Sequence, residues 1–142
     1  MAIRQVSVFI ENRPGRLAEV TRLLGGGGVN IRALSLADTE DFGVLRFIAS
    51  DPDAAKKILH GAGLTVRETP VLVVEVPDEP GGLAGALACL DSAGLNVEYM
   101  YAFVEKSGSA ALVVLRVEAA SAAEEVLRSS GYNALGEEVY DL

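Results

Sequence analysis

Glu11-Asn12-Arg13-Pro14-Gly15-Arg16-Leu17 has a counterpart 66 positions later in Pro77-Asp78-Glu79-Pro80-Gly81-Gly82-Leu83. Each run directly follows an apolar segment and carries a Pro-Gly pair at the same place. Asn30 and Asn96, which follow the next apolar run in each half, are also 66 residues apart. A repeat of this period predicts one structural unit that occurs twice in the chain.

The offset between matching positions grows along the chain, from 66 at the Pro-Gly pairs to 68 at Gly63 and Gly131. The additional residues therefore fall in a loop, as is usual in true repeats. We expect two units, residues 1–69 and 70–142. A unit of about 70 residues buries little surface and is only marginally stable alone. The units are therefore expected to pack on each other or to pair edge to edge.

The hydrophobic pattern of residues 1–69 changes between strand and helix periods. Pro14-Gly15 suits a helix start, and Asp51-Pro52 suits another, because Asp caps helices and Pro fits the first turn. The four glycines from Gly25 to Gly28 are expected to end the first helix. The expected elements are strands at 3–10, 29–38, 42–49 and 64–68, helices at 15–24 and from about 52 to 60, and a turn at Thr39-Glu40-Asp41.

Residues 70–142 repeat this order. The expected elements are strands at 71–76, 95–105, 110–117 and 135–140, helices at 83–90 and 122–129, and a hairpin turn at Lys106-Ser107-Gly108. Strand-helix-strand-strand-helix-strand is typical of an α+β, ferredoxin-like sandwich, an antiparallel four-stranded sheet with two helices on one face. The other sheet face also carries apolar residues, which indicates an interface.

The amino-acid composition disfavours several classes of partner and of functional site. A net charge of −8, from 12 basic and 20 acidic residues, disfavours nucleic acid and anionic membranes as partners. The single cysteine, Cys89, and the single histidine, His60, favour neither a disulfide nor a metal site. No cofactor, metal ligand or catalytic residue is therefore predicted. No long apolar run or leader is present, so a cytoplasmic protein is expected.

The loop at 12–17 is the best candidate for a binding site. Helix N–H groups and the positive end of the helix dipole attract a carboxylate. Gly15 allows a ligand close to the backbone, and the amide of Asn12 both donates and accepts hydrogen bonds. Asn30 is expected to return to the same edge of the unit. These features suit a zwitterion such as a free amino acid, although Asn12 and Asp78 also suit caps or turns.

The run from Glu11 to Leu17, followed by Gly28-Val29-Asn30-Ile31, resembles the signature of ACT domains. It is particularly similar to the regulatory domain of D-3-phosphoglycerate dehydrogenase. Because the resemblance covers both halves, the whole chain looks like a tandem ACT protein without a catalytic domain. The resemblance implies units that pair, bind a free amino acid between them and regulate, with a homodimer and a metabolic enzyme as the implied partners.

The resemblance also implies particular ligand contacts. The two amide ligands of the family match Asn12 and Asn30, while its ligand-binding histidine falls on Ile10, which argues against serine and indicates a more apolar pocket. Asp78 replaces Asn12 in the second unit and would repel a carboxylate but attract an ammonium. The expected contacts are Asn12, Arg13, Pro14, Gly15, Arg16, Leu17, Asn30 and Ile31 in the first unit, and Asp78, Pro80, Gly81, Gly82, Leu83, Asn96 and Val97 in the second.

Two other functions stay open. A structural adaptor would pair through its apolar sheet face without a small ligand. A small enzyme on the same fold would need a clustered base or nucleophile, which the sequence does not offer. Arg46 and Arg116 are expected at matching places in the third strand of each unit, either as carboxylate clamps or as solvated edge residues.

Overall fold

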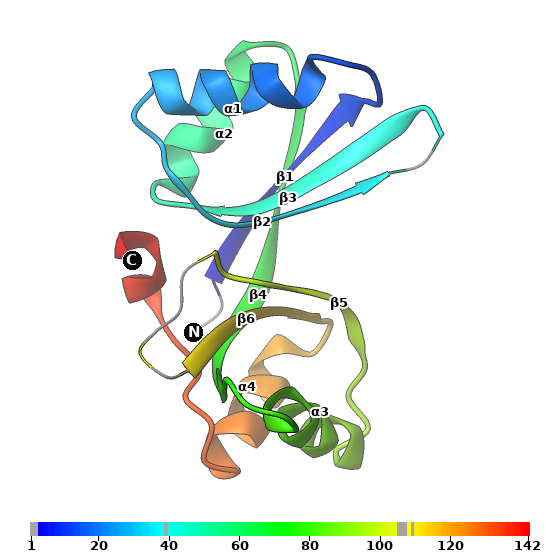
Figure 1. The fold of residues 1–142 in the computed structure, drawn as a ribbon, viewed down its shortest axis with the longest axis vertical. Coiled ribbons are helices and arrows are strands. Elements are labelled where there is room, and N and C mark those ends of the chain that lie inside the picture. The colour runs from blue at the N-terminus through cyan, green and yellow to red at the C-terminus, as the bar shows by residue number, and fades with distance from the viewer. Residues whose placement is uncertain (1–2, 39, 105–107, 109) are drawn as a thin grey trace. The chain divides into compact units, whose positions relative to one another are not determined.

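The computed structural model describes residues 3–38, 40–104, 108 and 110–142. Thr39 of the first predicted turn and Lys106-Ser107 of the second lie outside the described residues. The elements, shown in Figure 1, are β1 (Ile3–Glu11), α1 (Arg16–Gly26), β2 (Ile31–Asp38), β3 (Phe42–Ala49), α2 (Pro52–Gly61), β4 (Thr65–Pro77), α3 (Gly82–Ser92), β5 (Val97–Ala102), β6 (Ala110–Val117), α4 (Ala120–Ser129) and the 3-10 helix η1 (Glu137–Asp141).

Contacts within the chain divide it into two compact units. Arg4–Thr69 and Tyr140–Leu142 form one unit, which we call the N-terminal unit. Pro70–Val139, together with Ile3, form the other, the C-terminal unit. The strand β4 begins in the first unit and continues into the second.

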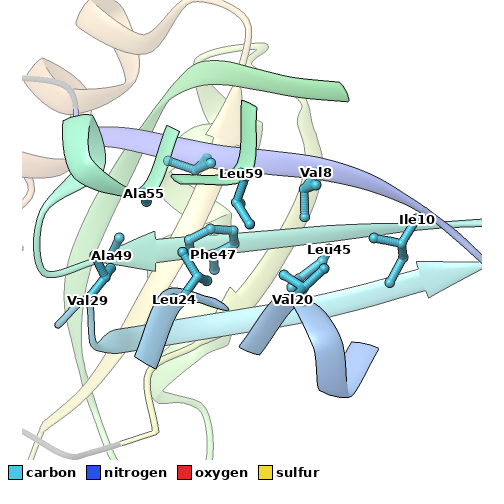
Figure 2. Packing of buried hydrophobic residues seen from close by; sticks show 11 residues of the cluster. Val8, Ile10, Val20, Leu24, Val29, Leu45, Phe47, Ala49, Ala55 and Leu59 are labelled. Atoms are coloured by element: carbon cyan, nitrogen blue, oxygen red, sulfur yellow. The ribbon is translucent and has the colours of Figure 1, made fainter. Parts of the chain in front are cut away.

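The N-terminal unit is a sheet with two helices on one face, as Figure 1 shows. Its strands lie in the order β2-β3-β1-β4, and β3 pairs antiparallel with both β1 and β2. Alternate residues of β1 and β3 meet apolar residues of α1 and α2, because strand residues two apart share a face. Figure 2 shows the resulting core around Phe47, which includes Val8, Ile10, Val20, Leu24, Val29, Leu45, Ala49, Ala55 and Leu59.

The C-terminal unit repeats this arrangement. β6 pairs antiparallel with both β4 and β5, and α3 and α4 supply the helical side of the core. Each fully buried Leu or Val contributes about 2 kcal/mol relative to an exposed position. The core consists of Leu72, Val74, Val76, Ala86, Leu90, Val113, Leu115, Val117, Ala123 and Leu127. The prediction of ferredoxin-like α+β units is confirmed.

The last strand of the second unit differs from the prediction. Residues 133–135 pair with β4 through an isolated bridge between Val74 and Ala134, whereas the predicted strand at 135–140 is replaced by η1. Gly136 and the two glutamates after it have low strand propensity. The N–H of Val139 instead turns back to donate to the carbonyl of Gly136 at 3.2 Å.

β4 also differs, because the two strands predicted at 64–68 and 71–76 form one continuous strand of 13 residues. Pro70 lies between the two predicted strands. Its fixed φ suits an extended backbone and it lacks only the N–H. Its carbonyl remains available and accepts a hydrogen bond from Nη1 of Arg116 at 3.1 Å.

The glycine run ends α1 later than predicted. Gly25 and Gly26 are helical, and Gly28 adopts the left-handed conformation with φ of 75°. β2 and β5 each start two residues later than expected, at Ile31 and Val97.

Both β2 and β5 contain an irregularity at the same place, between Ile31 and Ala33 and between Val97 and Tyr99. Ala33 then pairs with Ile48, and Tyr99 pairs with Arg116. The prediction that Arg46 and Arg116 occupy matching places is therefore wrong: Arg116 matches Ile48, because the offset in this strand is 68.

Arg116 has a structural role. Its Nε lies 3.1 Å from Oε1 of Glu98, and its Nη1 donates to the Pro70 carbonyl. Within the part of the chain that the structure describes, no helix is long and apolar enough to cross a membrane.

Candidate functional site

The two repeated loops have the same backbone conformation. Gly15 and Gly81 are the residues at which α1 and α3 begin, and both are left-handed, with φ of 89° and 84°. Glycine is favoured there because a Cβ disfavours this region of φ. The matching hydrogen bonds join the N–H of Arg13 to the carbonyl of Glu11, Arg16 to Arg13, Glu79 to Pro77 and Gly82 to Glu79.

Both helices start at a glycine, so neither α1 nor α3 has a side-chain cap from its N-cap residue. By contrast, Asp51 caps α2 by accepting from the N–H of Ala54 at 3.1 Å, which confirms that prediction. The positive dipole end of α1 attracts an anion.

Asn12 joins its loop to the turn between β2 and β3. Its backbone N–H donates to the carbonyl of Asp41 at 2.9 Å, and its Nδ2 lies 3.5 Å from the carbonyl of Glu40. This contact positions Asn12 at the end of β1, beside the start of β3.

Arg13 and Arg16 form a cluster of ion pairs around the loop. One Glu11 carboxylate lies 3.1 Å from Nη2 of Arg13 and 3.6 Å from Nη2 of Arg16, and Arg16 also pairs with Glu19 at 3.0 Å. All four side chains are at least a third exposed, so each pair contributes little stability. The cluster holds two guanidinium groups beside the loop at no net charge.

Gly82 takes the place of Arg16 in the second loop. It is buried, and a Cβ there would lie 1.9 Å from the carbonyl oxygen of Pro77. The second loop therefore packs against its own backbone where the first projects a guanidinium. Asp78 and Glu79 leave this loop acidic.

A cavity of about 60 Å³ lies beside Asn12. Three of the predicted contacts, Asn12, Arg13 and Leu17, line it. The remaining lining residues are Ile10, Glu11, Leu36, Asp38 and Gly43. Leu36, Asp38 and Gly43 were not predicted as site residues, although a glycine inside a strand is a signal of close approach.

A second cavity, of about 280 Å³, shares Ile10 and Glu11 with the first and includes Arg16, Glu19 and Phe42 in its lining. The matching cavity in the C-terminal unit measures about 450 Å³ and contains Asp78, Glu79 and Tyr132. The pair of cavities follows the repeat, but their linings differ in charge.

Asn30 does not lie at the edge that was predicted. Asn12 follows Glu11, which pairs with Phe42 at the start of β3, whereas Asn30 precedes Ile31, which pairs with Ala49 at its end. The two asparagines are therefore separated by the length of β3 and lie at opposite ends of the unit. The same holds in the C-terminal unit for Asp78 and Asn96, which flank opposite ends of β6.

The backbone of Asn30 is fixed by Ser50. The N–H of Asn30 donates to Oγ of Ser50 at 2.9 Å, and the N–H of Ser50 donates to the carbonyl of Asn30 at 2.8 Å. Its Oδ1 accepts from the N–H of Ile31 at 2.9 Å. Asn30 is exposed, and its side chain carries an NH₂ group that can donate hydrogen bonds.

The repeated fold and sequence match a known family. Residues 1–139 match the family described as "ACT domain pair". The chain belongs to the ACT domain pair family. No curated protein matches the sequence.

Solved structures resemble this ACT domain pair over nearly all of its length. Protein BT0572 from Bacteroides thetaiotaomicron is 39% identical with a TM-score of 0.93, covering 100% of this chain and 98% of that one. The ligand-free regulatory subunit of aspartate kinase from Thermus thermophilus is 19% identical with a TM-score of 0.65, covering 92% and 94%. The corresponding subunit from Thermus flavus is 18% identical with a TM-score of 0.63, covering 92% and 93%. The prediction of a tandem ACT protein is confirmed, and the narrower resemblance to D-3-phosphoglycerate dehydrogenase stays a prediction.

The most perturbed carboxyl group of the ACT pair lies away from the loops. Glu68 pairs with Arg4 and, at 2.6 Å, with Nζ of Lys56, while Arg4 also reaches Asp53 at 2.5 Å. Hydrogen bonding to Arg4, and secondarily to Lys56, lowers the pKa of Glu68 to about 2 against the opposing effect of burial. A carboxylate paired in this way is an ionised structural group. Across the described residues, no three His, Cys, Asp or Glu side chains gather as metal ligands would.

Proposed function

We propose that this ACT domain pair is a cytoplasmic regulatory protein, not an enzyme, that binds a free amino acid at the loop 12–17 of its N-terminal unit. The observation that carries the proposal is the start of α1 at the left-handed Gly15, which lies in the same loop as Asn12 and beside a cavity. Such a helix start attracts a carboxylate. Arg13 and Arg16 add N–H donors beside it, within a cluster that Glu11 and Glu19 bring to no net charge.

The charge of the two halves supports the choice of unit. Residues 1–69 contain nine basic and eight acidic residues, whereas residues 70–142 contain three basic and twelve acidic ones. A ligand carboxylate is therefore favoured in the N-terminal unit. We keep 1–69 and 70–142 as the proposed extents of the two ACT units.

The second amide of the site comes from a facing unit in this proposal. Asn12 and Asn30 lie at opposite ends of β3, so one unit alone does not bring both to one ligand. β2 has β3 as its neighbour and otherwise ends the sheet of its unit among the described strands. Antiparallel pairing of two β2 edges would place Asn30 of one unit beside Asn12 of the other, as a homodimer would allow.

A partner enzyme is the proposed receiver of the signal. The fold of the ACT pair is that of regulatory subunits of aspartate kinases. A ligand shifts a pairing equilibrium only by its differential affinity for the two states. Amino-acid binding between paired units would therefore change the surface offered to such an enzyme.

Thermal unfolding in the presence of each of the twenty amino acids tests the proposal. A ligand at a hundredfold excess over its Kd stabilises the folded protein by about 2.7 kcal/mol. We expect one or a few amino acids to raise the Tm, and Asn12→Ala and Asn30→Ala each to abolish the increase. Asp78→Ala is the matched control and keeps it. An unchanged Tm with every amino acid at millimolar concentration would overturn the proposal.

An adaptor that pairs without a ligand is the second candidate. Leu34, Leu36 and Phe42, on the hairpin of β2 and β3, are between two fifths and just over half exposed, and such apolar surface marks interaction sites. Sedimentation of the protein at several concentrations distinguishes the candidates. Self-association that Leu34→Ser weakens, with no response to any amino acid, would favour the adaptor.

A further inference from the structure

The cavity beside Asn12 has an apolar floor and a polar rim. Ile10, Leu17 and Leu36 form the floor, from β1, α1 and β2 respectively. Asn12 and Asp38 stand among the rim residues. The rim suits the charged groups shared by all amino acids, because the amide donates to a carboxylate and the Asp38 carboxylate accepts from an ammonium. The floor meets the part that differs between amino acids, the side chain.

Gly43 creates the space above this floor. A Cβ on Gly43 would lie 3.3 Å from Cδ1 of Leu36 and 3.6 Å from Cγ1 of Ile10. The glycine therefore leaves a gap of about one methyl group between these two side chains. Its φ is not in the left-handed region, so the backbone conformation does not require glycine. What glycine provides at this position is the space that a Cβ would occupy.

The C-terminal unit fills the same place. Ala111 pairs with Val76 as Gly43 pairs with Ile10, so a methyl group occupies the position that Gly43 leaves open. Ala102 matches Leu36 by pairing with Val113, as Leu36 pairs with Leu45. The N-terminal unit therefore has a larger apolar side chain at Leu36 and no side chain at Gly43, where its counterpart has two alanines.

The size and polarity of the cavity limit the side chain. A volume of about 60 Å³ corresponds to roughly two waters at about 30 Å³ each. A charged or amide side chain on this floor would lose its hydration without a partner from Ile10, Leu17 or Leu36, and that loss costs roughly 1–3 kcal/mol or more. The charged groups of the lining are already engaged in this arrangement. Glu11 pairs with Arg13 at 3.1 Å and with Arg16 at 3.6 Å, and Asp38 is assigned to the ligand ammonium.

We infer that the site selects amino acids with a short aliphatic side chain, such as valine, through the floor of Ile10, Leu17 and Leu36 and the gap at Gly43. The inference rests on the proposed amino-acid site and names its ligand class. Selection acts by desolvation and by volume, so it discriminates against charged side chains strongly and against a hydroxyl analogue of equal shape only moderately.

Isothermal titration of the wild-type protein with glycine, alanine, valine, leucine, threonine, aspartate and lysine tests the ligand class. We expect valine or leucine to bind about tenfold tighter than threonine and glycine, and aspartate and lysine to show no binding at millimolar concentration. Aspartate or lysine binding as tightly as valine would overturn the inference and leave the amino-acid site standing. No binding of any amino acid would remove the proposed function and this inference together.

Gly43→Ala tests the role of the gap. We expect it to weaken the binding of valine and leucine at least tenfold and to change the binding of glycine less than threefold. The control is Gly25→Ala, the same substitution in α1, where a Cβ meets no atom within 4 Å and binding should not change. Equal losses for glycine and valine in Gly43→Ala would overturn selection by side-chain volume.

Discussion

The loop 12–17 and the loop 78–83 share a backbone and differ in chemistry. Both place a left-handed glycine at the start of a helix and use the same turn hydrogen bonds. The first loop carries an amide and two guanidinium groups that pair with Glu11 and Glu19, and the second carries two carboxylates and a buried glycine. The comparison teaches that the repeated fold determines the backbone conformation of both loops. The side chains decide which of the two loops attracts an anion.

The largest expected effect is on stability, and it distinguishes substitution of Gly82 from substitution of its counterpart Arg16. Gly82→Ala would bring a Cβ to 1.9 Å from the carbonyl oxygen of Pro77, so the loop must move, at a cost of about 3 kcal/mol in the free energy of unfolding. Arg16→Ala should cost less than about 0.5 kcal/mol, because its ion pairs are exposed. Urea unfolding of both variants measures the difference. An unchanged midpoint for Gly82→Ala would show that the second loop is not tightly packed.

The next effect concerns binding. Asn12→Asp gives the first loop the residue of the second, and its charge should weaken the affinity for the ligand carboxylate about 30-fold, which equals about 2 kcal/mol. Asp78→Asn is the reciprocal variant and should leave the affinity of the N-terminal unit unchanged. Calorimetric titration of the two variants with the amino acid that stabilises the wild-type protein gives both values. Equal affinities would mean that Asn12 does not contact the carboxylate.

The shared frame predicts equal costs for Gly15→Ala and Gly81→Ala. Both residues have φ between 84° and 89°, and a Cβ on either meets no atom within 4 Å. The cost is therefore that of the left-handed backbone alone, about 1–2 kcal/mol for each. Chemical unfolding should give values within about 0.5 kcal/mol of each other. A markedly larger cost in one loop would break the equivalence of the two frames.

The smallest effect is the dependence on pH that Glu68 gives to the N-terminal unit. Arg4 and Glu68 match Pro70 and Gly136 in the C-terminal unit, where this ion pair has no counterpart. The folded-state pKa of Glu68 lies near 2, below its ordinary value of 4.5, so its stabilisation is complete above about pH 4.5 and is lost as the pH falls toward 2. Because the pair is partly exposed, we expect about 1 kcal/mol.

The measurement is the midpoint of urea unfolding at several pH values between pH 5 and pH 2.5, a range in which the loss of this stabilisation begins. Glu68→Gln should flatten the dependence relative to the wild-type protein. Hydrogen exchange of amides in the core of the N-terminal unit, compared with those of the C-terminal unit, assigns the loss to the correct half. A pH dependence of the same size in the variant would assign it to other carboxyl groups.

Much of the fold was predictable because its signals are local. The strand β3 begins and ends at the predicted residues, since Phe42 to Ala49 lies between a polar turn and the helix cap Asp51. The predictions for the ends of the chain's other elements were poorer. Residues 64–68 and 71–76 were expected to form separate strands, and 135–140 was expected to form another. Both predictions were wrong, because local propensity does not include the long-range partner that a segment finds.

The candidate site was predicted in part for the same reason. Asn12, Arg13 and Leu17 are neighbours in the sequence and line the cavity as expected. Leu36, Asp38 and Gly43 reach it only through the register of β2 and β3 with β1. Asn30 was placed at the wrong edge because the direction of β2 in the sheet is a property of the folded unit.

The sequence by itself determined that the chain is a repeated α+β unit with a glycine-started helix beside a polar loop, because periodicity and left-handed glycines act over a few residues. The tertiary structure alone decided that Asn12 and Asn30 lie at opposite ends of a unit, that Arg116 matches Ile48, and that Gly43 opens a cavity which Ala111 fills. Those features depend on strand pairing, in which a shift of one or two residues changes every neighbour of a side chain.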